Sequence, residues 1–372
     1  MVQFGCSRCA VHTTAIGPHV WFAVLLHSCQ LEFGSTIEKE LYKDMGVPQL
    51  IDRILTKRAA AFMGQADKYL LLSGEEGTEG WEAVGTMNQR PPLLLENCLS
   101  YDEMKISALV YVSGHTECIN DGERKNSGVV KEENAETEAV IIGTIGPRFQ
   151  RHFRMDYEDI LITEEQNIPE HGYGEEVTPT TCLNVLKNTY VRNNTSAKHM
   201  WRQMWSEFYQ VFKYTERYVK LFNHGYVFDN EVYYKRISVL AETVLIEADA
   251  RARDAGKMAY VNVIGCGLGV WQISKHQIDV YVLSVTERVK HLLRKDLLQH
   301  VSDVNFAWIQ PSDSIIGEKC GINVQIYKRE PSAKLKGEDE GKLLVMTYPW
   351  DGNAHPGNDF WSVSLLCHCL KV

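Results

Sequence analysis

The stretch YVNVIGCGLGVWQ, residues 260–272, decides how the rest of the chain is interpreted, because an apolar run ends there in three alternate glycines. The run predicts a buried strand, and Gly265, Gly267 and Gly269 predict a loop whose backbone lies close to a phosphate. A tight strand-to-helix turn without a ligand is the simpler alternative. Three glycines in five residues lose much chain entropy on folding, which favours a ligand.

A dinucleotide or methyl-donor site is one interpretation of this loop. Such a site needs G-x-G-x-x-G after a strand and an acid about 20 residues further on, at the end of the next strand. Glu287 lies at that distance after the strand-like run VYVLSV, but Gly269 comes one residue too early for the third glycine.

A shallow phosphate cradle is the second interpretation. Successive backbone N–H groups, with help from the following helix N-terminus, wrap a pyrophosphate there without the third glycine. The bulky residues Leu268, Val270 and Trp271 would close over the ligand.

The runs around this loop predict an α/β domain. Periodic apolar residues indicate helices at 198–221, at 230–255 with Gly256 as its C-cap, and in a segment that ends at 288–298. Buried strands are expected at 139–149, 158–164, 258–265, 304–309, 322–328 and 342–349. The polar segment 119–137 separates a region of uncertain role, 1–138, from a core domain, 139–372.

Composition excludes several classes of partner. Lys+Arg at 39 against Asp+Glu at 48 gives a formal net charge of -9, which does not attract nucleic acid. The apolar run VWFAVLL, 20–26, is too short to span a membrane. Ten cysteines scattered singly indicate reduced thiols and a cytoplasmic protein. Cys6 and Cys9 have the spacing of a metal knuckle, but no second C-x-x-C pair lies at the distance that a zinc ribbon needs.

The loop WDGNAHPGNDFW, 350–361, follows the strand at 342–349 and carries the most concentrated chemistry of the chain. Loops that follow buried strands place reactive groups at the carboxyl edge of an α/β sheet. Asp351 and Asp359 can orient a water, stabilise an oxocarbenium-like transition state or bind a guanidinium. A surface loop in which the acids cap backbone amides explains the composition equally well.

Two pairs of motifs resemble a known family. VIGCGLGVWQ and YPWDGNAHPGNDFW, preceded by GPRFQRHFRMDYEDILIT and ISVLAETVLIEADARARDAGK, are similar to the arginine-specific, macrodomain-type ADP-ribosylhydrolases. That family includes a bacterial effector that removes ADP-ribose from ubiquitin, and it has insect relatives. The resemblance spans roughly residues 139–361.

The resemblance implies a three-layer α/β/α macrodomain with an elaborated N-terminal region, and it assigns a role to each motif. ADP-ribose is then the ligand, and the scissile bond is the N-glycosidic bond to an arginine side chain. Asp351 and Asp359 would be catalytic. The residues expected to bind ADP-ribose are Gly265, Gly267, Leu268, Gly269, Val270, Trp271, Asn353, Gly357 and Asn358.

The same resemblance sets the expectations for partners. An ADP-ribosylated protein is the substrate, with ubiquitin as a candidate, and neither a cofactor nor a metal is needed. A monomer is expected. The alternatives are a macrodomain that binds ADP-ribose without cleaving it and a Rossmann-type methyltransferase.

Two departures from the family pattern bear on activity. After the second tryptophan the chain runs SVSLLCHCLKV, which resembles a truncated or alternatively spliced end and favours the non-catalytic alternative. His355 stands in the acidic loop, where it is expected to be solvent-exposed. Asp156, Glu158 and Asp159 are expected at a solvated strand end, with contact to an adenine or a distal ribose as the alternative.

Overall fold

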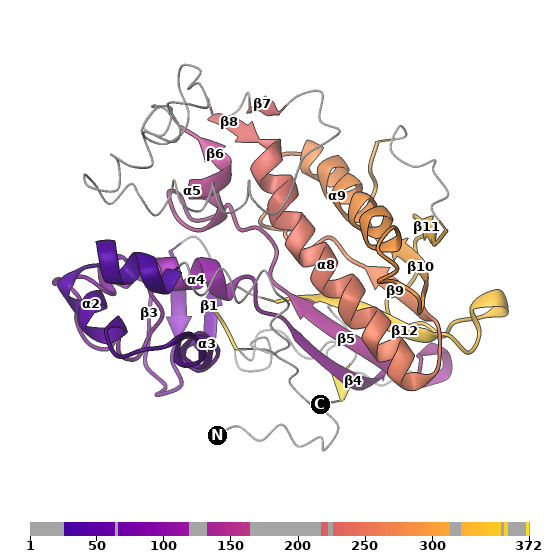
Figure 1. Ribbon diagram of the computed structural model, residues 1–372, viewed down its shortest axis with the longest axis horizontal. Coiled ribbons are helices and arrows are strands. Elements are labelled where there is room, and N and C mark those ends of the chain that lie inside the picture. Colours follow the sequence, from indigo (N-terminus) through magenta and orange to yellow (C-terminus); the bar gives the residue numbers. More distant parts are fainter. Residues whose placement is uncertain are drawn as a thin grey trace.

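A mixed β-sheet forms the centre of the protein (Figure 1). The computed structural model describes residues 26–63, 66–118, 132–163, 217–221, 226–312, 321–350, 353–355 and 370–371. Within this part of the chain, seven strands pair in the order β11-β10-β9-β12-β5-β4-β13. They are β4 (Val112–Cys118), β5 (Ala139–Thr144), β9 (Ala259–Val263), β10 (Val301–Phe306), β11 (Asn323–Gln325), β12 (Leu343–Pro349) and β13 (Leu370–Lys371).

The direction of the strands decides where a site can form. β11, β10, β9, β12 and β5 are parallel to one another, and β4 is antiparallel to β5. Strand β9 is buried throughout, and β12 is buried over its first five residues. Their side chains are apolar or uncharged, as is usual for parallel strands covered on both faces. The carboxyl ends of β5, β12 and β9 therefore lie side by side at one edge.

Helix α8 (Asn230–Ala255) packs across β5, β9, β10 and β12, and α9 (His276–Leu293) packs against α8 (Figure 1). The Asp229 side chain accepts from the N–H groups of Glu231 and Val232 at the N-terminus of α8. Gly256 ends the helix with a φ of 63°, a left-handed conformation that glycine adopts without strain. Both bounds confirm the predicted helix at 230–255.

The N-terminal region forms a smaller unit beside the sheet, around a separate hydrophobic cluster that includes Phe62, Tyr69 and Trp81. Its elements are α2 (Thr36–Tyr42), α3 (Val47–Thr56), α4 (Tyr101–Ser107), the short helix η1 (Trp81–Ala83) and a sheet of β1 (Ala61–Met63), β2 (Lys68–Leu70) and β3 (Glu76–Gly77). Ala354 and Met155 of the core also belong to this cluster. Region 1–138 also contributes strand β4 to the central sheet. A domain boundary at residue 138 stays a prediction.

A third sheet, of three strands, differs from two of the predicted elements. It consists of β6 (Leu161–Ile162), β8 (Tyr226–Asp229) and β7 (Tyr218–Leu221), in the order β6-β8-β7. The strand predicted at 158–164 was wrong in its first half, where α5 (Asp156–Ile160) forms. The helix predicted at 198–221 was wrong at its end, because β7 pairs with β8; residues 198–216 lie outside the described part.

The remaining predicted strands are confirmed with shifted ends, and the short helices η2 (Glu132–Asn134) and η4 (Gly337–Asp339) complete the described elements. Helix α9 stops at Leu293, five residues before the predicted end, and Asp296 then turns the chain with a φ of 54°. A mixed α/β fold is confirmed. Its arrangement as a three-layer macrodomain belongs with the proposals below.

Candidate functional site

Three loops meet at the carboxyl edge of β5, β12 and β9. The loop after β5 contacts the loop after β9, since the Thr144 hydroxyl lies 3.3 Å from the Cys266 thiol. Thr347 on β12 accepts a hydrogen bond from the Ile264 N–H at 2.8 Å. The Trp350 N–H donates to the Thr144 carbonyl at 2.9 Å, which joins the loop after β12 to β5.

The glycine loop is shaped by close backbone contact. Gly267 has a φ of 82°, and a Cβ there would lie 2.8 Å from the Pro147 carbonyl oxygen. A Cβ on Gly146 would lie 2.3 Å from the Gly267 nitrogen, so both glycines are required by the packing of the two loops. Gly269 differs from them, because a Cβ there would meet nothing within 4 Å.

The amides of this loop are available for a ligand. Within the described part of the chain, the N–H groups of Gly267, Gly269, Val270 and Trp271 donate no backbone hydrogen bond. Val270 is 75% exposed, and Leu268 and Trp271 are partly buried. Helix α9 begins only at His276, so the helix end does not form part of this loop.

The acidic loop is described only in part. Asp351, Gly352, Gly357, Asn358 and Asp359 lie outside the described residues, and Asn353–His355 lie within them. Asn353 is completely buried, and neither its amide nitrogen nor its amide oxygen has a hydrogen-bond partner among the described groups. Because buried amides are almost always hydrogen-bonded, this one is a candidate for contact with a ligand.

Arg58 anchors the described part of this loop, and sequence patterns gave no sign of it. Its guanidinium donates to the carbonyls of Ala354 at 3.3 Å and Ser107 at 2.7 Å. The same group lies over the Trp350 ring, 4.4 Å from the centroid. Burial lowers the pKa of Arg58 to about 9, which leaves the group charged at neutral pH.

His355 is only partly exposed, contrary to the prediction. Its backbone N–H donates to the Ala59 carbonyl at 3.0 Å, and its Nε2 is buried without a hydrogen-bond partner in the described part. Burial lowers the pKa of His355 below its usual value, and the charge of Arg58 acts in the same direction. The pairing of Ala354 with Ala59 holds the backbone of His355 against the N-terminal region.

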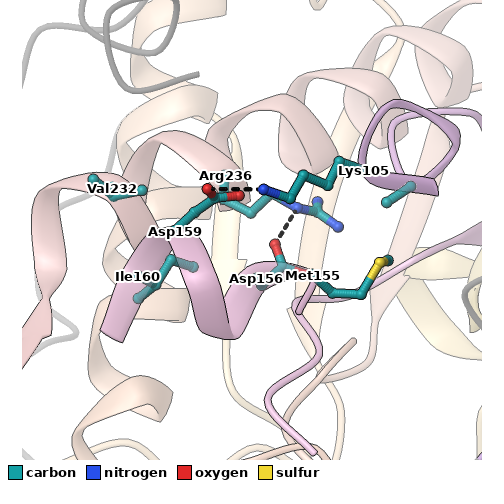
Figure 2. A pocket seen from close by; sticks show the side chains of 8 residues that line it. Lys105, Met155, Asp156, Asp159, Ile160, Val232 and Arg236 are labelled. Atoms are coloured by element: carbon teal, nitrogen blue, oxygen red, sulfur yellow. Dashed lines mark hydrogen bonds and ion pairs between the residues drawn. The ribbon is translucent and has the colours of Figure 1, made fainter. Parts of the chain in front are cut away.

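The acids that precede β6 are paired and at least partly buried, so a solvated strand end was the wrong prediction. Asp156 accepts from Arg236, and Lys105 forms an ion pair with Asp159 at 3.2 Å (Figure 2). Lys105 also pairs with Glu158 at 2.8 Å. Burial raises the pKa of Asp159 to about 6, against the effect of the Lys105 ammonium. The cavity among these side chains has a volume of about 20 Å³, room for a water molecule or so and not for a nucleoside.

The dinucleotide or methyl-donor interpretation of the glycine loop was wrong. Residues 280–285 lie inside helix α9 and do not form a strand, and Glu287 on the same helix pairs with Lys290. The next parallel strand is β10, which begins at Val301. Glu287 therefore does not lie at the sheet edge where an acid would bind a ribose.

The remaining chemical groups are unremarkable over the described ranges. Cys29, Cys98, Cys118 and Cys266 are buried there and form no disulfide with one another, and no cluster of three metal-binding side chains occurs. No helix in that part of the chain is long and apolar enough to cross a bilayer.

The fold and site define a mixed α/β protein whose sheet edge combines a glycine loop with open amides and an acidic loop. Residues 11–369 match the family described as ADP-ribosylhydrolase MavL-like. The chain therefore belongs to the MavL-like ADP-ribosylhydrolase family, and it is a hydrolase.

Two relatives from Drosophila melanogaster agree with this assignment. The chain is 37% identical over 373 residues to ADP-ribosylarginine hydrolase CG2909, covering 94% of this chain and 70% of the relative. It is 39% identical over 356 residues to ADP-ribosylarginine hydrolase CG3568, covering 91% and 67%. The expected insect relatives are thus confirmed.

Proposed function

We propose that this enzyme removes ADP-ribose from arginine side chains of modified proteins by cleaving the N-glycosidic bond. One observation carries the proposal: amides of the glycine loop and the buried side-chain amide of Asn353, all without a partner among the described residues, lie on loops that leave adjacent parallel strands. Such an edge suits a diphosphate next to a ribose. The names of the two insect relatives support arginine as the linked residue.

The proposed roles follow the chemistry of each group. Gly265, Gly267, Leu268, Gly269, Val270 and Trp271 cradle the diphosphate, and Asn353, Gly357 and Asn358 bind ribose hydroxyls or fix the loop. Asp351 and Asp359 hold the arginine guanidinium and the ribose and assist the attack of water on the anomeric carbon. The bond from that carbon to the arginine nitrogen breaks, water supplies the new hydroxyl, and its proton goes to the guanidine.

The decisive experiment follows release of ADP-ribose with time from a peptide that carries ADP-ribosyl-arginine. We expect turnover by the native chain and loss of turnover in Asp351→Ala, with binding of free ADP-ribose retained. A binding protein without activity would retain the label on the peptide. Unchanged hydrolysis by Asp351→Ala would falsify the assigned role.

Hydrolysis of the N-glycosidic bond with the help of two carboxylates needs neither a metal nor a cofactor, and we propose that none takes part. Prolonged treatment with EDTA is therefore expected to leave the rate of ADP-ribose release unchanged. Inhibition by EDTA that Mg²⁺ or Mn²⁺ reverses would contradict this proposal. The matched control is EDTA already saturated with Mg²⁺, which separates chelation from an effect of the chelator itself.

The finer assignments are part of the same proposal. We infer a macrodomain core, action as a monomer in the cytoplasm, and ubiquitin as one candidate substrate protein. Reduced, buried cysteines in the described ranges support a reducing compartment. Comparison of release rates from arginine-modified ubiquitin and from an unrelated modified protein tests the choice of substrate.

A further inference from the structure

Asp67 forms a buried junction between the N-terminal region and the loop after β5. The residue lies between β1 and β2 with a φ of 49°, and it is 2% exposed. Its carboxylate accepts from Arg148 Nη2 at 2.7 Å and Arg151 Nε at 2.9 Å. The Tyr101 hydroxyl, from α4, donates to the same carboxylate. The Asp67 carboxylate thus joins two guanidinium groups of a single loop, and Arg151 also pairs with Glu82 of η1.

That loop, residues 145–151, packs against the glycine loop. Gly146 and Gly267 are in backbone contact that leaves no room for a Cβ on either. The Gln150 side-chain amide donates to the Val270 carbonyl at 3.2 Å, at the exposed tip of the glycine loop. A shift of residues 145–151 would therefore move the amides that face the ligand.

The opposite side of the loop is held by the core. The Arg148 N–H donates to Asp156 at 2.9 Å, and Arg236 of α8 donates to Asp156 at 3.0 Å and to the Ile145 carbonyl at 2.8 Å. The loop is thus fixed by α8 on one side and by the N-terminal region on the other. The Arg148 guanidinium also lies over the Phe62 ring of β1, 5.2 Å from its centroid.

We propose that Asp67 is a positioning residue for diphosphate binding, through which the N-terminal region sets the shape of the glycine loop. The inference rests on the proposed role of that loop as a phosphate cradle. Without the Asp67 carboxylate, the buried Arg148 guanidinium loses an ion pair, whereas Arg151 keeps its pair with Glu82. Because losing the pair of a buried charge is costly, we expect Arg148 to shift. Pro147 and Gly146 move with it, which disturbs the packing against Gly267.

The diphosphate is present in substrate and transition state alike, which determines the kinetic signature. Loss of its binding raises KM and the Kd for ADP-ribose and leaves kcat nearly unchanged. A merely structural defect lowers the active fraction, and hence apparent kcat, without changing Kd. The two outcomes can therefore be separated.

The test compares Asp67→Asn with Glu103→Gln. Glu103 is an equally buried carboxylate, but its partners Tyr42, Arg53 and Ser100 all belong to the N-terminal region. Calorimetry with ADP-ribose is expected to give about a tenfold higher Kd for Asp67→Asn and no change for Glu103→Gln. Asp67→Glu, which keeps the charge, should recover part of the affinity.

A second readout needs no ligand. Amide hydrogen exchange of residues 264–272 is expected to be faster in Asp67→Asn than in Glu103→Gln, measured at conditions of equal global stability. If Asp67→Asn does not fold, Arg151→Gln removes one of the two guanidinium ties at a side chain that is 27% exposed, and it should shift both readouts in the same direction.

The outcomes separate the two proposals. Equal affinity and equal exchange in the Asp67 and Glu103 variants would overturn the positioning role. If the native chain itself does not bind ADP-ribose, the proposed function fails, and the exchange of the glycine loop still decides whether Asp67 holds it in place.

Discussion

Gly267 and Gly269 are two residues apart in one loop, yet they are required for different reasons. The backbone at Gly267 is left-handed and packed against Pro147, whereas a Cβ at Gly269 meets only open space. Packing fixes the first glycine. We propose that the approach of a ligand accounts for the second.

These two glycines give a matched pair of variants. Gly267→Ala is expected to lower the free energy of unfolding by about 1–3 kcal/mol, because alanine is strained at positive φ. Gly269→Ala should keep its stability and bind ADP-ribose more weakly. Thermal denaturation and calorimetry on both variants check this, and full binding by Gly269→Ala would remove the loop tip from the site.

Asn353 should show a conflict between stability and binding. A buried amide without a hydrogen-bond partner costs folding free energy, and the Asn353 amide has none among the described residues. Leucine fills a similar volume without polar atoms. Asn353→Leu is expected to raise the free energy of unfolding by about 1 kcal/mol and to weaken ADP-ribose binding. Urea denaturation and calorimetry measure the two effects; a variant that is less stable and binds normally would indicate a purely structural amide.

Among the elements, the short pairing of Ala354 with Ala59 carries a consequence for pH. It places the partly buried His355 beside the N-terminal region, where burial and the charge of Arg58 lower the pKa of the imidazole below its unfolded value. The folded protein therefore binds fewer protons than the unfolded chain just below the unfolded pKa. Stability from this group is present above that pKa and is lost as pH falls toward the folded pKa.

The free energy of unfolding is accordingly expected to decrease as pH falls from about 7 to about 5. His355→Gln should flatten this decrease, and His276, whose pKa is also lowered by burial, should account for part of the remainder. Urea denaturation at a series of pH values gives both slopes. Identical slopes for native chain and His355→Gln would contradict a partly buried, neutral His355.

For the molecule as a whole, side-chain contacts that involve charged residues link the N-terminal region to the core. Arg58 reaches Ala354, Asp67 reaches Arg148, and Lys105 reaches Asp159. β4 also runs within the central sheet. These contacts favour one cooperative unit over two domains divided at residue 138.

Calorimetric unfolding is therefore expected to show a single transition, with van't Hoff and calorimetric enthalpies in agreement. Breaking the Asp67 junction should lower the one transition temperature and not split it. Two separable transitions in the native chain would instead support independent domains, with the boundary near residue 138.

Local sequence signals were sufficient to predict the elements whose ends are set by capping or turn residues. Asp229 and Gly256 define α8, and the glycine loop follows a buried strand, because caps and turn residues act over only a few neighbours. β7 was missed, since Tyr218–Leu221 gains its conformation only by pairing with β8. The same limit applies to the strand ends, which the neighbouring strand decides.

The candidate site divides in the same way. The residue types of the glycine loop and the acidic loop predicted phosphate binding and carboxylate chemistry, since that chemistry depends on the groups themselves. The assignment to ADP-ribose came from the resemblance to the family and stays a prediction. Arg58, Asp67 and the burial of His355 were decided by tertiary structure alone: Arg58 and Ala354 are 296 positions apart, and no local pattern records such a contact. Isolated charged residues become structural only when folding removes them from water and brings their partners together.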